Sequence, residues 1–433
     1  MSERPGPEQD PEIKAPRSRS ARPIPRRLFR PLQEFLETST ASGVFLLGAV
    51  VVALVWVNSP WDGSYFSLLA TPISVGAGDL EVAGDLHFWI NEGLMSLFFL
   101  VVGLEIKREL TTGELRRPRA VLLPMIAAAT GMAVPALLFL VVVGGGPGAR
   151  GWGIPMATDV AFALGVLALA AARTPGGLRP LLLAIAIVDD IGSVIVVAAF
   201  SPGAIAVAWL AASVGVAGLV YVFPKLHIRA APLYIALGIG LWYAMFRAGV
   251  HPALAGVVVG LLTPSEPFSR PRAIRHEEVS PLVRVEHALL PWTSFVVLPV
   301  FALANVGVPL SAAAIATAAG SAVAWAVLIA RVGGKIAGIW GGAVIASKLG
   351  LADLPPGVGS MHLAGMAAAG GTGFTVSLFV AEVAFGRESP LLAHVKISLL
   401  AASVVSAVVA LILLRRAGSG SEVAARGPAT EPT

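Results

Sequence analysis

The chain has no cysteine and few charged residues. Of its 433 residues, 13% are charged and 56% are hydrophobic, and the mean hydropathy is +0.80. The absence of cysteine excludes disulfide frameworks, thiolate metal sites and cysteine catalysis. Soluble domains carry about 25% charged residues, so the composition indicates an integral membrane protein.

Long apolar runs recur along the chain, which excludes a very apolar soluble core. We expect an all-α integral membrane protein with about twelve transmembrane helices. They are predicted near residues 42–57, 88–106, 120–143, 152–172, 180–200, 203–222, 232–247, 249–263, 286–306, 319–346, 361–384 and 391–414. The tenth stretch is too long for one straight span, so part of it is expected to be loop.

The distribution of basic residues predicts the orientation. Of the 31 Lys and Arg residues, three fall in the odd-numbered loops (Arg150, Arg247 and Arg387) and three within predicted helices (Arg331, Lys335 and Lys396). The others lie in the tails and the even-numbered loops, which places both termini in the cytoplasm. This topology accounts for the net charge of +5 without a nucleic-acid partner; the expected surroundings are membrane lipid.

The domain organisation follows from the same pattern. Residues 1–35 are rich in Pro, Arg and Ser and contain no apolar signal-peptide core, so they are predicted to be a disordered, basic cytoplasmic tail. Residues 36–414 form one twelve-helix membrane domain, and 415–433 form a short cytoplasmic C-terminal tail.

The first outer loop, residues 71–82, has the pattern of a β-hairpin. Thr71–Val75 and Leu80–Val82 are short β-like runs on either side of a Gly-Ala-Gly-Asp turn. An ordinary polar loop is the alternative. An exposed hairpin has unpaired edges that can pair with a second copy, which predicts a homodimer.

Two adjacent aspartates, Asp189 and Asp190, interrupt the otherwise uncharged run from Pro180 to Phe200. A carboxylate near the bilayer centre costs roughly 2.5–3.5 kcal/mol on insertion scales. Adjacent helical residues point about 100° apart, so one aspartate is expected to face Lys335 and the other an aqueous cavity. This pattern is typical of a transport site.

The fourth and eleventh spans carry residues that disfavour helix. Pro155 precedes Thr158 and Asp159 in the fourth, and Gly370–Gly373 lie in the eleventh. Interrupted helices occur at membrane depth only where they are buried or line a cavity. Asp159 is expected near converging half-helix N-termini and Lys335 near converging C-termini; simple capping of the second half-helix is the alternative for Asp159. Helices three to five and ten to twelve are expected to be inverted repeats of one unit.

Four further predictions concern charged or titratable residues near helix ends. Arg331 is expected at a solvated position near its helix end, and Lys396 is expected to snorkel to the outer surface. Glu105, Glu109, Glu286 and His287 form either solvated interface charge or a cluster that titrates with internal pH. His251 is expected to be a packing or interface histidine and not a ligand.

Several motifs in order along the chain identify a family. They are Trp89–Glu92, Gly103–Leu110, Ala157–Gly165, Val188–Gly192, Gly249–His251, Glu286–His287 and Gly373–Ser377. Over residues 36–414 the chain resembles the NhaA-type sodium/proton antiporters, a family that is itself a standard example of inverted-repeat transporters. The resemblance implies a multi-pass protein of the bacterial inner membrane with interrupted helices four and eleven. It also implies pH-regulated exchange of Na⁺ or Li⁺ for protons, without a cofactor.

The resemblance also implies roles for residues. Asp189 and Asp190 would bind the ion and protons, with Thr158 and Asp159 assisting. Lys335 would pair with the first aspartate, Asp189, and compensate its charge. Glu105, Glu109, Glu286 and His287 would respond to pH, and the hairpin would make the dimer contact. The second proton carrier, Asp189 or Lys335, stays open.

Three other functions are less compatible with the sequence. A sodium-coupled symporter needs polar groups for an organic solute, and few occur beyond Thr158, Thr372 and Thr375. A cation channel would present repeated filter residues instead of one asymmetric carboxylate pair. An enzyme would need a catalytic triad or metal-ligand cluster, and the sequence contains no such pattern.

Overall fold

The fold is described by a computed structural model that covers residues 39–76, 78–113, 118–170, 174–200, 205–226, 228, 230–266 and 280–425. The predicted basic tail (1–35) and residues 426–433 lie outside these ranges.

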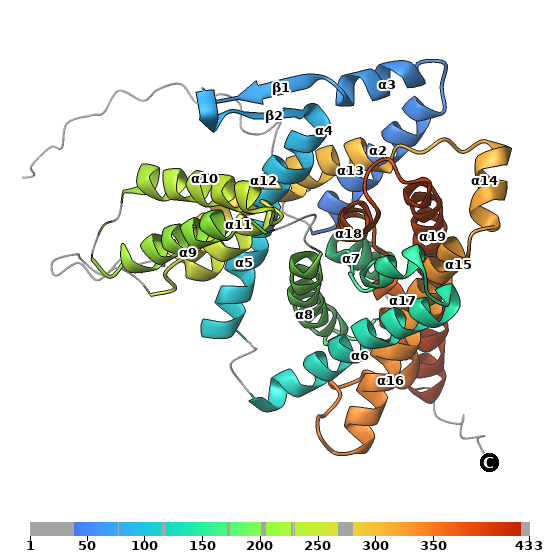
Figure 1. Cartoon of the computed structure of the whole chain (residues 1–433). Coiled ribbons are helices and arrows are strands. Elements are labelled where there is room, and N and C mark those ends of the chain that lie inside the picture. Colours follow the sequence, from blue (N-terminus) through green and yellow to red (C-terminus); the bar gives the residue numbers. More distant parts are fainter. Residues whose placement is uncertain are drawn as a thin grey trace, which may run out of the picture. The chain divides into compact units, whose positions relative to one another are not determined.

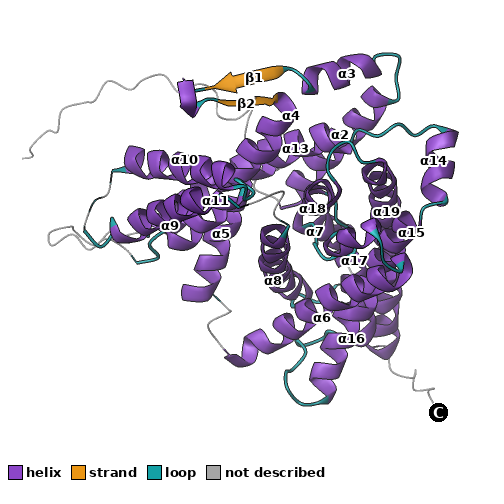
Figure 2. Cartoon of the chain, in the orientation of Figure 1, coloured by secondary structure: helices purple, strands orange, loops and turns teal. Residues whose placement is uncertain are grey.

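Helices make up most of the described chain (Figure 1; Figure 2). The N-terminal half contains α2 (Ser39–Val57), α3 (Asp62–Leu69), α4 (Leu86–Phe88), α5 (Met95–Thr111), α6 (Pro118–Val143), α7 (Val160–Leu169), α8 (Leu178–Ala199) and α9 (Val207–Val222). The C-terminal half contains α10 (Ala231–Ala248), α11 (Leu254–Leu262), α12 (Pro281–Trp292), α13 (Leu298–Val306), α14 (Ala312–Ala319), α15 (Ala322–Ile329), α16 (Lys335–Lys348), α17 (Ser360–Gly370), α18 (Thr375–Phe385) and α19 (Pro390–Ala425).

Wider π-helical turns join some neighbouring helices into continuous spans. Trp89–Leu94 connects α4 to α5, Thr293–Val297 connects α12 to α13, and Ala330–Gly334 connects α15 to α16. By length and composition, seven helices of the described chain can cross a membrane, or nine if each bent pair counts as one span. Each of the twelve predicted stretches contains helix, and the number twelve itself stays a prediction.

The tenth predicted stretch is almost entirely helical. Residues 320 and 321 separate α14 from α15, and the helix then continues from Ala322 to Lys348. The loop expected within this stretch is therefore confined to its start. The predicted end of the twelfth helix at residue 414 was wrong, because α19 extends to Ala425. No proline interrupts it in this region, since the next one is Pro428.

The two predicted helix interruptions are present. A 3-10 helix, η4 (Pro147–Gly153), and a turn lead into an extended segment that ends at Asp159, where α7 begins. In the eleventh stretch, α17 and α18 are separated by Gly371–Phe374 and their axes differ by 50°. The amide of Asp159 donates to the carbonyl of Thr372 (3.3 Å), so the two breaks lie side by side.

The first predicted loop forms the expected β-hairpin. Strands β1 (Pro72–Val75) and β2 (Val82–Asp85) pair antiparallel, with Pro72 opposite Asp85 and Val75 opposite Val82. The second strand begins two residues later than predicted, because Gly78–Leu80 forms a 3-10 turn.

An ion pair between Arg387 and Asp85 ties the base of the hairpin to the segment that follows α18. Burial raises the pKa of Asp85, but hydrogen bonds from the Phe88 amide and from Arg387 outweigh it, so the pKa lies below its ordinary value.

Glycines allow two helix pairs to approach closely. A Cβ at Gly256 of α11 would lie 2.0 Å from the carbonyl oxygen of Ser96 on α5. A Cβ at Gly338 of α16 would lie 2.4 Å from the carbonyl oxygen of Thr130 on α6. The Thr130 hydroxyl donates to the Gly338 carbonyl (2.7 Å). Small residues at such contacts let membrane helices pack backbone to backbone, and this contact holds the helix that carries Lys335 against α6.

Helix α8, which carries the aspartate pair, lies among the interrupted spans. It contacts α5, α6, α7, α17 and α18 (Figure 1). The carboxylates at its middle are thereby brought to the two helix breaks.

Candidate functional site

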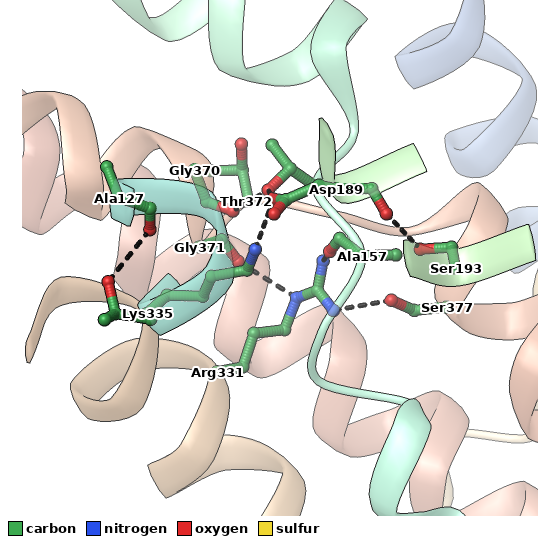
Figure 3. A network of polar contacts seen from close by, with 12 residues as sticks. Ala127, Ala157, Asp189, Ser193, Arg331, Lys335, Gly370, Gly371, Thr372 and Ser377 are labelled. Carbon is green, nitrogen blue, oxygen red and sulfur yellow. Dashed lines mark hydrogen bonds and ion pairs between the residues drawn. The ribbon is translucent and has the colours of Figure 1, made fainter. Parts of the chain in front are cut away.

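Asp189 is fully buried and has two partners on one oxygen. The Lys335 ammonium lies 2.5 Å from Oδ2, and the Thr158 hydroxyl donates to the same oxygen (2.6 Å). Lys335 is also fully buried. Oδ1 of Asp189 has no hydrogen-bond partner among the described residues. The sequence predicted that one aspartate of the pair faces Lys335, and the structure assigns this contact to Asp189 (Figure 3).

Asp190 has different surroundings. It is half-buried, and within the described ranges its carboxylate makes no hydrogen bond or ion pair. Because α8 is regular here, Asp190 points away from the direction of Asp189. A carboxylate without protein partners retains all its lone pairs for a cation or a proton. The aqueous cavity expected beside it stays a prediction.

Asp159 joins the N-termini of two half-helices. Its Oδ1 accepts from the Phe162 amide in the first turn of α7 (3.4 Å). Its Oδ2 accepts from the hydroxyl (2.9 Å) and the amide (3.4 Å) of Thr375 at the start of α18. The predicted position near converging N-termini is confirmed, and so is the alternative that Asp159 caps the second half-helix. A carboxylate there is stabilised by the partial positive charge of both helix ends.

The Thr158 hydroxyl also connects the two breaks. Besides its bond to Asp189, it donates to the carbonyl of Gly370 at the end of α17 (3.1 Å). Thr158 therefore links α8 to the end of the other interrupted span.

The cation that donates to the carbonyls at the helix C-termini is Arg331, which was not predicted in this role; the position predicted for Lys335 near these ends stays a prediction. The Arg331 guanidinium donates to the carbonyls of Ala157 (2.7 Å), Ile154 (3.2 Å) and Gly371 (3.0 Å). It also donates to the Ser377 hydroxyl (2.5 Å). Figure 3 shows the guanidinium between Ala157, Gly371 and Ser377, beside the Lys335 ammonium.

The expectation that Arg331 is solvated was wrong, because its side chain is fully buried. Arg331 lies within the π-helical turn Ala330–Gly334, far from either end of the continuous helix Ala322–Lys348. The sequence showed a second cation four residues before Lys335. Its distance from the helix ends was the signal that indicated a buried position.

The residues proposed to respond to pH gather around Arg108. The Arg108 guanidinium lies 2.6 Å from Glu286, 3.6 Å from Glu109 and 4.0 Å from Glu105. His287, in contrast, is exposed and has no hydrogen bond or ion pair with the residues that the structure describes. The three glutamates therefore form one cluster, and the position of Arg108 at its centre was not predicted.

A second polar cluster was not predicted. A cavity of about 190 Å³ is lined by Asn91, Glu92, His251, Phe379, Glu382, Val383 and Arg387. Glu382 accepts from the Asn91 amide (2.6 Å), and His251 lies 3.2 Å from Glu92. His251 is therefore a partner of Glu92 in addition to packing against Phe379. Glu382 is the one charged residue of α18, and this isolated charge was the signal in the sequence.

Comparison with known proteins establishes the family. Residues 33–414 match the family model described as Na+/H+ antiporter 1. The chain belongs to this family. It is 40% identical to the Na(+)/H(+) antiporter NhaA 2 of Sorangium cellulosum (strain So ce56), over 95% of this chain and 96% of the relative. It is 41% identical to the Na(+)/H(+) antiporter NhaA of Anaeromyxobacter sp. (strain Fw109-5), over 94% and 95%.

Membership of the Na+/H+ antiporter 1 family agrees with the predicted resemblance and with a multi-pass membrane protein. No group of three or more His, Asp or Glu that could hold a resident metal ion occurs in the described part of the chain. In an antiporter a sodium ion is cargo, so its ligands need hold it only during part of the cycle.

Proposed function

We propose that this protein extrudes Na⁺ or Li⁺ from the bacterial cytoplasm in exchange for protons, by alternating access in the inner membrane. Asp190 is the main ligand of the ion, and Asp189 is the proton-linked gate. One observation carries the proposal: Asp189 is buried against Lys335, whereas its neighbour Asp190 has no protein partner in the described chain.

The charges at the site suit a single monovalent cation. Asp159, Asp189 and Asp190 supply three carboxylates, and Arg331 and Lys335 supply two cations. With all five ionised, one negative charge is left over, which one Na⁺ neutralises. Sodium is a hard cation that prefers oxygen ligands, and carboxylates and freed backbone carbonyls supply them here.

Protons and sodium compete for the same carboxylates. At high internal pH the deprotonated pair binds Na⁺ from the cytoplasm, and on the outer side protons displace it. We propose an exchange of two protons per Na⁺, which is electrogenic, so that the proton gradient and the membrane potential both drive extrusion. The second proton is carried by Asp189 or by Lys335, which holds Asp189 while the ion is absent. The protein thereby serves pH and sodium homeostasis.

The finer organisation belongs to the same proposal. Both termini are cytoplasmic, the twelve helices contain two inverted three-helix repeats, and the hairpin makes the contact of a homodimer. The cluster of Glu105, Glu109 and Glu286 adjusts activity to internal pH. The protein is a secondary transporter and not an enzyme.

Solute symport is a weaker candidate on this geometry. The hydroxyls that an organic solute would need are already bonded within the protein: Thr158 to Asp189, Thr375 to Asp159 and Thr372 to the Ala369 carbonyl (2.6 Å).

Everted vesicles with an imposed pH gradient test the proposal. Addition of Na⁺ or Li⁺ is expected to collapse the gradient, and Asp190→Asn is expected to abolish the response because the amide cannot supply the charge. Equal activity with K⁺ would refute the ion selectivity. A fully active Asp190→Asn variant would refute the site.

A further inference from the structure

The interrupted spans meet at the Arg331 guanidinium, which carries neither the ion nor a proton in the proposed transport cycle. Three carbonyls from two chain segments accept from Arg331: those of Ile154 and Ala157, which follow η4, and that of Gly371, which follows α17. Helix C-termini carry partial negative charge on such carbonyls. The arginine therefore places a positive charge at the helix C-termini, as Asp159 places a negative charge at the helix N-termini.

Arginine suits this position better than lysine. Its planar guanidinium offers five N–H donors in a fixed geometry and keeps its charge at every working pH. All four hydrogen bonds of Arg331 come from this one guanidinium, and one of them reaches Ser377 in the first turn of α18. A lysine ammonium has three donors at a single point and cannot reach all of these acceptors together.

Asp159 and Asp189 attract Arg331, and the neighbouring Lys335 repels it. Asp190, next to Asp189, is influenced by Asp159, by Glu105 of α5 and by Lys335 as well. A permanent positive charge in this cluster opposes protonation of the carboxylates and also weakens their attraction for a cation.

We propose that Arg331 is the permanent cation at the point where the two interrupted spans meet. It holds the helix ends together, and its fixed charge sets the pH at which the aspartates release their protons. Because Arg331 neutralises the helix ends, the charge of Lys335 is available to pair with Asp189. This inference rests on the proposed antiport function. Arg331 is a positioning residue, since it acts on the ion only through the carboxylates and the helix ends.

Two variants separate the two roles. Arg331→Gln removes the charge and is expected to raise the pH of half-maximal sodium-dependent activity by about one unit, because the carboxylates then hold their protons more tightly. The apparent KM for Na⁺ at saturating pH is expected to fall. Arg331→Lys keeps the charge and is expected to leave the pH midpoint unchanged while lowering the melting temperature. Arg247→Gln, which replaces an exposed arginine on α10, is the control. It should change neither the pH midpoint nor the apparent KM for Na⁺.

A second measurement needs no transport. In detergent, the melting temperatures of Arg331→Gln and Lys335→Gln are compared at pH 8 and pH 5. The partner of Lys335 is a carboxylate, so protonation of Asp189 at low pH should relieve the Lys335→Gln defect. The hydrogen-bond partners of Arg331 are carbonyls and a hydroxyl, so its defect should persist at both values. If Arg331→Gln yields no folded protein, Arg331→Lys must show a lower melting temperature at both pH values.

The outcomes distinguish the two proposals. A wild-type protein without sodium-dependent activity refutes the antiport function. An active wild type refutes the role of Arg331 if folded Arg331→Gln keeps the wild-type midpoint, or if Arg331→Lys shifts the midpoint as far as Arg331→Gln does. A defect of Arg331→Gln that disappears at pH 5 also refutes it.

Discussion

At the scale of single residues, the aspartate pair divides into two environments. One oxygen of Asp189 accepts from both Lys335 and Thr158, and the other has no partner in the described chain. A buried ion pair is sensitive to loss of one member, because the remaining charge is then uncompensated. The pair is thus stable only while a cation, a proton or Lys335 accompanies Asp189.

The Thr158 hydroxyl is expected to tune this balance. Thr158→Val keeps the shape of the side chain and removes the donor to Asp189 and to the Gly370 carbonyl. We expect a loss of about 1 kcal/mol of stability and slower sodium-dependent transport. Melting curves and vesicle assays measure the two effects.

Ser193→Ala is the matched control, since the Ser193 hydroxyl donates only to the backbone carbonyl of Asp189 one turn earlier (2.9 Å). Transport reduced equally in both variants would contradict a specific role of the Thr158 hydroxyl.

At the scale of elements, the two interrupted helices are held together by one acidic and one basic residue. Asp159 accepts from the N-termini of α7 and α18, and Arg331 donates to the carbonyls after η4 and α17. Each unsatisfied backbone group in a membrane interior costs several kcal/mol. The two side chains therefore make an irregular backbone tolerable at this depth.

The close contact of α16 with α6 yields a second prediction. Gly338→Ala would place a Cβ 2.4 Å from the Thr130 carbonyl oxygen, so the helices must separate. We expect a loss of about 1–3 kcal/mol and weaker transport, because Lys335 lies one turn away on the same helix. Thermal melting in detergent measures the first effect and the vesicle assay the second.

Gly333 provides a control on the same continuous helix. A Cβ there would meet no atom within 4 Å, so Gly333→Ala should be neutral or stabilising by up to ~1 kcal/mol. Equal losses in both variants would show that the contact with α6 is unimportant.

At the scale of the whole molecule, the proposed homodimer depends on the hairpin. Val75 of β1 and Leu80 of the connecting turn are 55% and 64% exposed, and such apolar edges favour pairing with another strand. The chain has no cysteine, so a single introduced cysteine reports contacts between copies without background.

Ser74→Cys places a thiol on an exposed position of β1. Oxidation in native membranes is expected to give a disulfide-linked dimer on non-reducing gels. Thr317→Cys, exposed on α14 and predicted on the same side of the membrane, should remain monomeric. Dimers at both positions, or at neither, would contradict a specific hairpin contact.

The positions of the apolar helices, the two breaks and the hairpin were all predictable from the sequence. Apolar length, proline and glycine act locally and leave a direct pattern in the chain. The family was also predictable, because several motifs occur in order. The end of α19 at Ala425 was not, because Gly and Ser lower helix propensity without ending a helix.

The sequence by itself determined a membrane protein with a carboxylate pair whose burial costs free energy, and with a lysine that can neutralise part of that charge. Only the tertiary structure decided that Lys335 and Thr158 share one oxygen of Asp189, that Asp159 accepts from Phe162 and Thr375 and that Arg331 lies at the C-termini. The physical reason is that burial and pairing of a charge depend on segments far apart in the chain. Arg331 and Gly371 are 40 residues apart, and Asp189 and Lys335 are 146 apart; no local pattern encodes such a contact.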